Sequence, residues 1–195
     1  LFQLLLFLFS HQRKCRDNHL QEHHKVLTYP RTDSRYLSDD IVATLKDRLR
    51  AVNTGEYKKY VATLFRQEYG KKAFYINNQK VTDHHAIIPT EEMANYAKMS
   101  SDERRIYDLV VKRFLSVLMP AYEYTQTSVV AQLGEEQYVA KGKVTKAEGF
   151  KVIYQKDSFE EIDSKEIKHQ ELPMLKVGDM LHVESIQITS GKTTP

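Results

Sequence analysis

The sequence predicts an α+β protein whose first part is mostly helical and whose second part is rich in antiparallel β-structure. From about residue 19 to residue 98, apolar residues recur mainly at the three- and four-residue spacing of helices. After Pro120 the spacing changes to the alternation that is typical of strands. With 195 residues, 41% hydrophobic and 28% charged, the chain can form one or two small globular domains with a real core.

Three helices are expected, over residues 38–53, 57–70 and 100–120. Ser38 can cap the first, which carries acidic residues in its first turn and stops at an Asn-Thr-Gly run. The third opens with Ser100 and Glu103, which are spaced as a capping box, and Pro120 closes it.

Strands are expected over residues 125–133, 138–142, 150–154 and 183–188, where apolar and polar residues alternate or β-formers cluster. Gly134 and the two glutamates after it predict a hairpin turn between the first two strands. These strands would follow the third helix in a β-rich segment.

The composition excludes several classes of protein. The single cysteine, Cys15, cannot form an internal disulfide, and no Cys/His cluster has zinc spacing, so we expect no metal site and a cytoplasmic location. The apolar run over residues 1–9 is about half the roughly 20 residues that a membrane-spanning helix needs. The net charge of +3 means that binding to nucleic acid would depend on local patches.

The run TYPRTDS over residues 28–34 is the strongest candidate for chemistry. Pro30 favours an extended backbone at Tyr29, so Tyr29 and Arg31 are expected to project from the same face. A guanidinium can clamp two phosphate oxygens while a phenolate attacks phosphorus, which suits a phosphodiester substrate. Thr32 and Ser34 are expected to shape the turn by local hydrogen bonds, and their hydroxyls are candidates for phosphate contacts.

A basic stretch follows, with eight Lys or Arg against three Asp or Glu between residues 46 and 72. Such a face could follow a single nucleic-acid strand, with tyrosines offering stacking surfaces, or could be a solvated helix face. The candidate DNA-binding residues in it are Lys46, Arg48, Arg50, Lys58 and Lys59.

Three segments together resemble one known family. Residues 24–38 (HKVLTYPRTDSRYLS) are similar to the active-site segment of type IA DNA topoisomerases, closest to the bacterial topoisomerase III branch. Residues 81–90 (VTDHHAIIPT) resemble the second signature of that family, and residues 107–120 resemble the segment that leads out of its tyrosine domain. The resemblance runs from about residue 20 to the C-terminus.

The resemblance implies roles for three residues. Tyr29 would be the nucleophile that becomes linked to a DNA 5′-phosphate, and Arg31 would hold the scissile phosphate. His84 matches the active-site histidine of the family, although only the alignment separates it from His85. The substrate would be single-stranded or underwound DNA, cleaved and resealed without ATP.

The resemblance also implies a division of the chain. Residues 1–18 would be an unmatched leader, residues 19–98 the helical catalytic-tyrosine domain, and residues 99–195 an incomplete part of the β-rich gate domain. Mg²⁺ would be held by an acidic Toprim domain that we do not find in this sequence. We therefore expect an internal fragment that works with the rest of a topoisomerase polypeptide near the nucleoid, without turnover of its own.

Two alternatives remain open. A relaxase or recombinase also forms a phosphotyrosine, but the first needs a histidine cluster and the second needs dispersed Arg and His positions; neither pattern is present. The chain could also be a non-catalytic module that binds single-stranded nucleic acid. A steep salt dependence of binding would indicate phosphate contacts.

Overall fold

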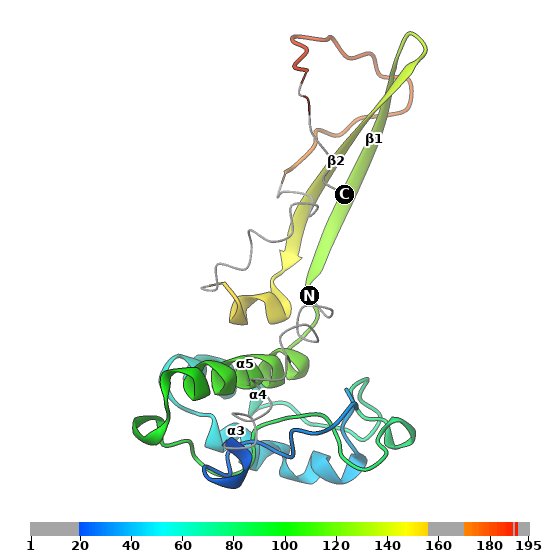
Figure 1. The fold of residues 1–195 in the computed structure, drawn as a ribbon. Helices are drawn as coiled ribbons and strands as arrows, with labels where there is room; N and C mark the ends of the chain where they lie inside the picture. The colour runs from blue at the N-terminus through cyan, green and yellow to red at the C-terminus, as the bar shows by residue number, and fades with distance from the viewer. Residues whose placement is uncertain (1–19, 156–169, 189, 191–195) are drawn as a thin grey trace. The chain divides into compact units, whose positions relative to one another are not determined.

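The computed structural model describes residues 20–155, 170–188 and 190 (Figure 1). The chain divides into two units, one formed by Leu1–Glu123 with Ala147–Ser164 and the other by Tyr124–Lys146 with Lys165–Pro195. The leader 1–18 and Cys15 lie outside the described residues. The predicted α+β class is confirmed, and the domain limits at residues 98 and 99 remain a prediction.

The helices of the first unit begin near the predicted positions but are shorter. A 3-10 helix, Asp39–Thr44, follows Ser38 and leads into α3, Leu45–Ala51. A second 3-10 turn, Gly55–Tyr57, leads into α4, Lys58–Leu64, which ends before the predicted stop at Gly70.

The third helix, α5, is the longest and covers Ser101–Leu118. Its predicted capping box is confirmed: the Glu103 amide donates to Ser100 Oγ at 3.3 Å, and the Ser100 amide donates to Glu103 Oε2 at 2.7 Å. These two bonds satisfy amides that a helix N-terminus leaves without intrahelical partners.

Between α4 and α5 the chain is less helical than predicted. It contains only two short 3-10 helices, Asn78–Lys80 and Tyr96–Lys98, within otherwise extended or turning chain. Extended segments here pair with other parts of the unit, as at the Leu37–Ile76 bridge. Nonlocal pairing therefore competes successfully with the helical spacing of the apolar residues.

A single apolar core holds the first unit together. It combines the inner faces of the three helices with residues from the extended segments, and its side chains are at most 6% exposed. Members from the helices and from the extended segments are Leu45, Leu49, Val61, Leu64, Val111, Leu115, Leu27 and Ile88. The extended segments are therefore anchored by burial as well as by hydrogen bonds.

The predicted strand over 150–154 is wrong, because the chain forms a 3-10 helix there, Gly149–Ile153. Tyr154 donates its hydroxyl to Ser116 Oγ on α5 at 3.1 Å, and Tyr60 on α4 donates to the Val152 carbonyl at 2.7 Å. Packing against two helices thus replaces the strand pairing that β-forming residues would otherwise seek.

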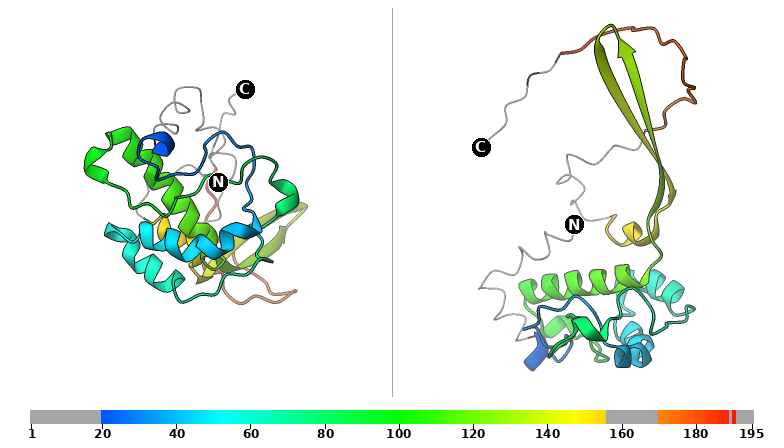
Figure 2. Two further views of the ribbon diagram at one scale, coloured as in Figure 1. Left: turned by 90° about the horizontal axis from the view of Figure 1, so that it is seen from below. Right: turned by 90° about the vertical axis from the view of Figure 1, so that its right-hand side faces the viewer.

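The second unit contains a long, twisted hairpin of two antiparallel strands (Figure 2). The strands are β1, Glu123–Leu133, and β2, Glu136–Ala147, and the predicted turn at Gly134 is confirmed by its φ of 61°. The predicted strand over 183–188 is wrong, since no strand is assigned there. Within the described residues 170–188, Gln170 is the residue that forms a β-bridge, and its partner is Lys143 on β2. Alternation alone cannot make a strand without a neighbour to accept its hydrogen bonds.

We predict that Gly149→Ala destabilises the first unit by about 3 kcal/mol or more. Gly149 has a φ of 48°, and a Cβ there would overlap the carbonyl group of Ala121 and lie 2.6 Å from the Pro120 oxygen. Urea unfolding followed by far-UV circular dichroism measures the loss.

Gly55→Ala is the matched control. Gly55 has nearly the same φ, 49°, but nothing lies within 4 Å of an added Cβ, so only the backbone strain of about 1 kcal/mol is expected. Equal losses in the two variants would contradict the close approach of residue 149 to Ala121.

Candidate active site

Two segments far apart in the sequence pair to form the candidate site. We call residues 26–36 the tyrosine segment and residues 84–91 the histidine segment. The Thr28 amide donates to the Ile88 carbonyl, and the Thr90 amide donates to the Val26 carbonyl, both at 3.0 Å. Between these bonds Leu27 faces Pro89 in an antiparallel pair. The pairing places the backbone before Tyr29 against the histidine segment.

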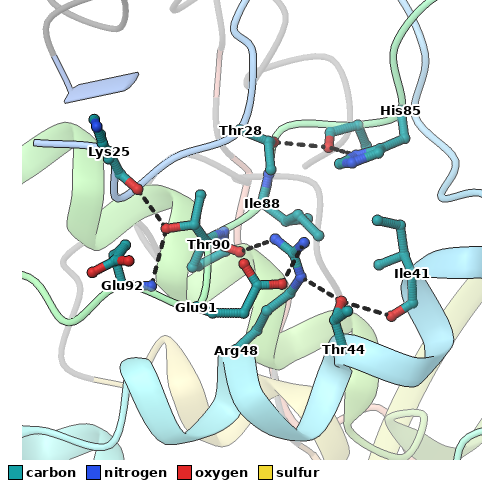
Figure 3. Close-up of polar contacts among 12 residues, drawn as sticks. Lys25, Thr28, Ile41, Thr44, Arg48, His85, Ile88, Thr90, Glu91 and Glu92 are labelled. Carbon is teal, nitrogen blue, oxygen red and sulfur yellow. Dashed lines mark hydrogen bonds and ion pairs between the residues drawn. The ribbon is translucent and has the colours of Figure 1, made fainter. Parts of the chain in front are cut away.

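Threonine side chains reinforce this pairing. Thr28 Oγ1 accepts the Ile88 amide at 3.0 Å, so its side chain extends the backbone pairing. Thr90 Oγ1 donates to the Lys25 carbonyl at 2.6 Å, as Figure 3 shows. Lys25 has a φ of 56°, so the backbone turns sharply just before the tyrosine segment.

The contact continues beyond Pro30. Thr32 Oγ1 donates to the His84 carbonyl at 2.7 Å, and Ser34 Oγ donates to the Lys80 carbonyl at 2.8 Å. Thr32 Oγ1 also accepts the Ser34 amide at 3.1 Å, which confirms the predicted turn-shaping hydrogen bond. Both hydroxyls therefore have protein partners, and contacts from them to phosphate remain a prediction.

The pairing brings Tyr29 and His84 together. Their ring centroids are 4.3 Å apart, with 40° between the ring planes. Tyr29 is half-buried and His84 is exposed, so a ligand can reach the pair from solvent. His85 instead uses its ring in a local contact, in which Nδ1 donates to the carbonyl of the next residue, Ala86, at 2.7 Å. The geometry separates two histidines that the sequence distinguishes only by alignment.

Arg31 is exposed, one residue beyond Pro30. Several other tyrosines are poor candidates for a nucleophile, because burial raises the pKa of each and makes its phenolate harder to form. They are Tyr57, Tyr69, Tyr75, Tyr96 and Tyr107.

The basic residues predicted to bind DNA do not form one uniform face. Lys46 pairs with Glu68 at 3.0 Å, and Arg50 pairs with Asp47 while its guanidinium lies 5.0 Å from the Phe65 ring centroid. Lys58 and Lys59 are both exposed on α4. Acidic neighbours thus offset part of the local positive charge, and a DNA-binding role for these residues remains a prediction.

Arg48 has a different place from the one expected. Its side chain is 7% exposed, donates to the Pro89 carbonyl at 2.7 Å and pairs with Glu91 at 2.8 Å. Burial lowers the pKa of Arg48, and the charge of Glu91 opposes that shift. The structure therefore corrects its assignment to an exposed basic face. The sequence held a signal for burial, since Arg48 shares a helical stripe with Leu45 and Val52.

The described part of the chain does not fit a metal ion. Within it, no group of three or more His, Cys, Asp or Glu side chains is placed to hold one. In the same residues, no helix is long and apolar enough to cross a membrane.

Comparisons with known proteins identify the family. The family model described as DNA topoisomerase matches residues 15–195. The chain is 49% identical over 177 residues to the DNA topoisomerase 3 of Bacillus subtilis (strain 168) and 48% identical over 176 residues to that of Bacillus licheniformis. Each match covers 90% of this chain and 24% of the relative, so the chain spans about a quarter of the length of these curated relatives. The chain belongs to the type IA DNA topoisomerase family and is similar to its topoisomerase III members.

Proposed function

We propose that this chain supplies the nucleophile of a topoisomerase that cleaves and reseals one DNA strand through a 5′-phosphotyrosine intermediate. The observation that carries the proposal is the 4.3 Å contact between the rings of Tyr29 and His84, in a chain that belongs to this family. Its substrate would be single-stranded or underwound DNA, and the outcome would be relaxation or unlinking of DNA.

The chemistry is an exchange of one phosphodiester for another. The Tyr29 oxygen attacks phosphorus as its proton departs, the bond from phosphorus to the 3′-oxygen breaks, and that oxygen leaves as a protonated 3′-hydroxyl. His84 would donate to a phosphate oxygen or help to move the proton, since an imidazole can both donate and accept a proton. Because the energy of the ester bond is conserved, resealing is the reverse step and needs no ATP.

Arg31 would hold the scissile phosphate with paired hydrogen bonds and stabilise the charge that develops in the transition state. Thr32 and Ser34 could add phosphate contacts from the same turn. Exposed Lys58 and Lys59 offer a path for a single strand next to Tyr60, whose ring lies 4.6 Å from Lys59 Nζ.

The remaining parts of the proposal concern the complete protein. Mg²⁺ would be held by an acidic domain of the same polypeptide. This chain alone would bind single strands weakly and would not turn over. The complete protein would act in the cytoplasm, on nucleoid DNA.

We predict that Tyr29→Phe abolishes covalent linkage to DNA, because only the attacking hydroxyl is lost. The assay uses a chimera in which the chain replaces the matching segment of the Bacillus subtilis relative, incubated with a single-stranded oligonucleotide and separated under denaturing conditions. With the chimera that retains Tyr29, label at the 3′ end of the oligonucleotide should move with the protein, and label at the 5′ end should not. With Tyr29→Phe, neither label should move with the protein.

Tyr36→Phe is the matched control, since Tyr36 lies in the same segment, is also half-buried and should be dispensable for attack. Any labelled adduct formed by the chimera that carries Tyr29→Phe would overturn the assignment of the nucleophile. A parent chimera that binds the oligonucleotide but forms no adduct would favour the non-catalytic binding module.

We also predict that Arg31→Lys slows adduct formation by roughly 100-fold, as expected when a transition-state hydrogen-bond donor is lost. An ammonium keeps the charge but cannot grip two oxygens in one plane. The measurement is the single-turnover rate in the same chimera, with Arg35→Lys, also exposed, as control. Equal rates for Arg31→Lys and the parent would exclude a bidentate phosphate contact.

A further inference from the structure

The Arg48 side chain is enclosed by three partners from two parts of the first unit (Figure 3). Its Nη1 donates to the Pro89 carbonyl at 2.7 Å, its Nη2 pairs with Glu91 at 2.8 Å, and its Nε donates to Thr44 Oγ1 at 2.9 Å. Thr44 precedes α3, whereas Pro89 and Glu91 belong to the histidine segment. The guanidinium therefore joins the start of α3 to the histidine segment.

Thr44 fixes the direction in which the guanidinium points. The Thr44 hydroxyl donates to the Ile41 carbonyl at 3.0 Å, which leaves its oxygen free to accept from Arg48. Because a guanidinium is planar, an aimed Nε also aims the two outer nitrogens. The hydrogen bond to Thr44 thus orients the guanidinium so that its two outer nitrogens face Pro89 and Glu91.

The Pro89 carbonyl needs a partner outside the paired segments. The bonds from Thr28 to Ile88 and from Thr90 to Val26 flank the Leu27–Pro89 pair, which makes that pair the non-hydrogen-bonded kind. Its own amide and carbonyl positions face outward. Proline has no backbone N–H, so at this position only its carbonyl needs a hydrogen-bond partner. Pro89 is buried, and Arg48 donates the hydrogen bond that its carbonyl accepts.

We propose that Arg48 is a positioning residue that holds the histidine segment in place so that His84 stays against Tyr29. This inference rests on the proposed function, but it concerns a residue that contacts neither ring. Arg48 holds Pro89 through the hydrogen bond to its carbonyl. Pro89 lies between the two backbone hydrogen bonds that join the histidine segment to the tyrosine segment. His84 is the first residue of the histidine segment. Loss of the guanidinium would let the histidine segment shift against the tyrosine segment.

The test replaces Arg48 by Lys, which keeps one positive charge but cannot reach Thr44, Pro89 and Glu91 together. The first measurement is the nuclear Overhauser contact between the ring protons of Tyr29 and His84 in the 195-residue chain. We expect the contact to be weakened or lost. In the chimera, adduct formation should fall roughly 10- to 100-fold, as it does when reacting groups are displaced slightly.

Two further variants sharpen the test. Arg105→Lys changes an exposed arginine on α5, outside the candidate catalytic and DNA-binding residues, and should leave the ring contact and the adduct rate unchanged. Thr44→Val removes only the hydroxyl that accepts a hydrogen bond from Arg48 Nε, so it should weaken the ring contact partially. If Arg48→Lys does not fold, Thr44→Val serves as the test variant in its place.

The outcomes separate this inference from the proposed function. An unchanged ring contact in folded Arg48→Lys, or in Thr44→Val when Arg48→Lys does not fold, overturns the positioning role. A lost contact in a variant whose parent forms no adduct supports the positioning role and rejects the catalytic proposal. If Arg48 instead bound DNA, Arg48→Gln would keep the ring contact and lower the salt dependence of oligonucleotide binding, because one positive charge is lost.

Discussion

The antiparallel pairing of residues 26–28 with residues 88–90 is the constraint on which the rest of the site depends. Two backbone hydrogen bonds and a threonine hydroxyl join segments about 60 residues apart. Leu27 and Ile88 are at most 5% exposed, so the pair is also fixed by burial in the core of the first unit. Tyr29 directly follows this pairing and His84 lies four residues before Ile88, so the pairing limits how far the two rings can move apart.

The division of labour within the site follows from this constraint. Arg31 and His84 are exposed and open to a ligand, while the backbone bonds that join the two segments are made by their neighbours at residues 26, 28, 88 and 90. Thr28, Thr32 and Ser34 use their hydroxyls to join backbone to backbone. Small hydroxyl side chains suit this role because they reach neighbouring amides and carbonyls without large conformational cost.

Arg48 illustrates how a charged residue can serve an interior contact. Removing a guanidinium from water is unfavourable unless its donors are satisfied, and here three acceptors surround it. Glu91 remains 43% exposed, so part of the ion pair keeps contact with water. The charge pattern of the sequence is the same whether Arg48 is buried or lies on a solvated helix face, so the pattern alone does not distinguish the two.

The sequence by itself determined the features whose physics is local. The capping box at Ser100, the glycine turn at residue 134 and the tyrosine motif before Arg31 depend on residues within a few positions of one another. Only the tertiary structure decided which histidine faces Tyr29, that Arg48 is buried, and that a 3-10 helix, Gly149–Ile153, replaces the strand predicted over residues 150–154. Each of these depends on partners tens of residues away, and the spacing of apolar and charged residues carries no record of which distant backbone atoms will accept a hydrogen bond.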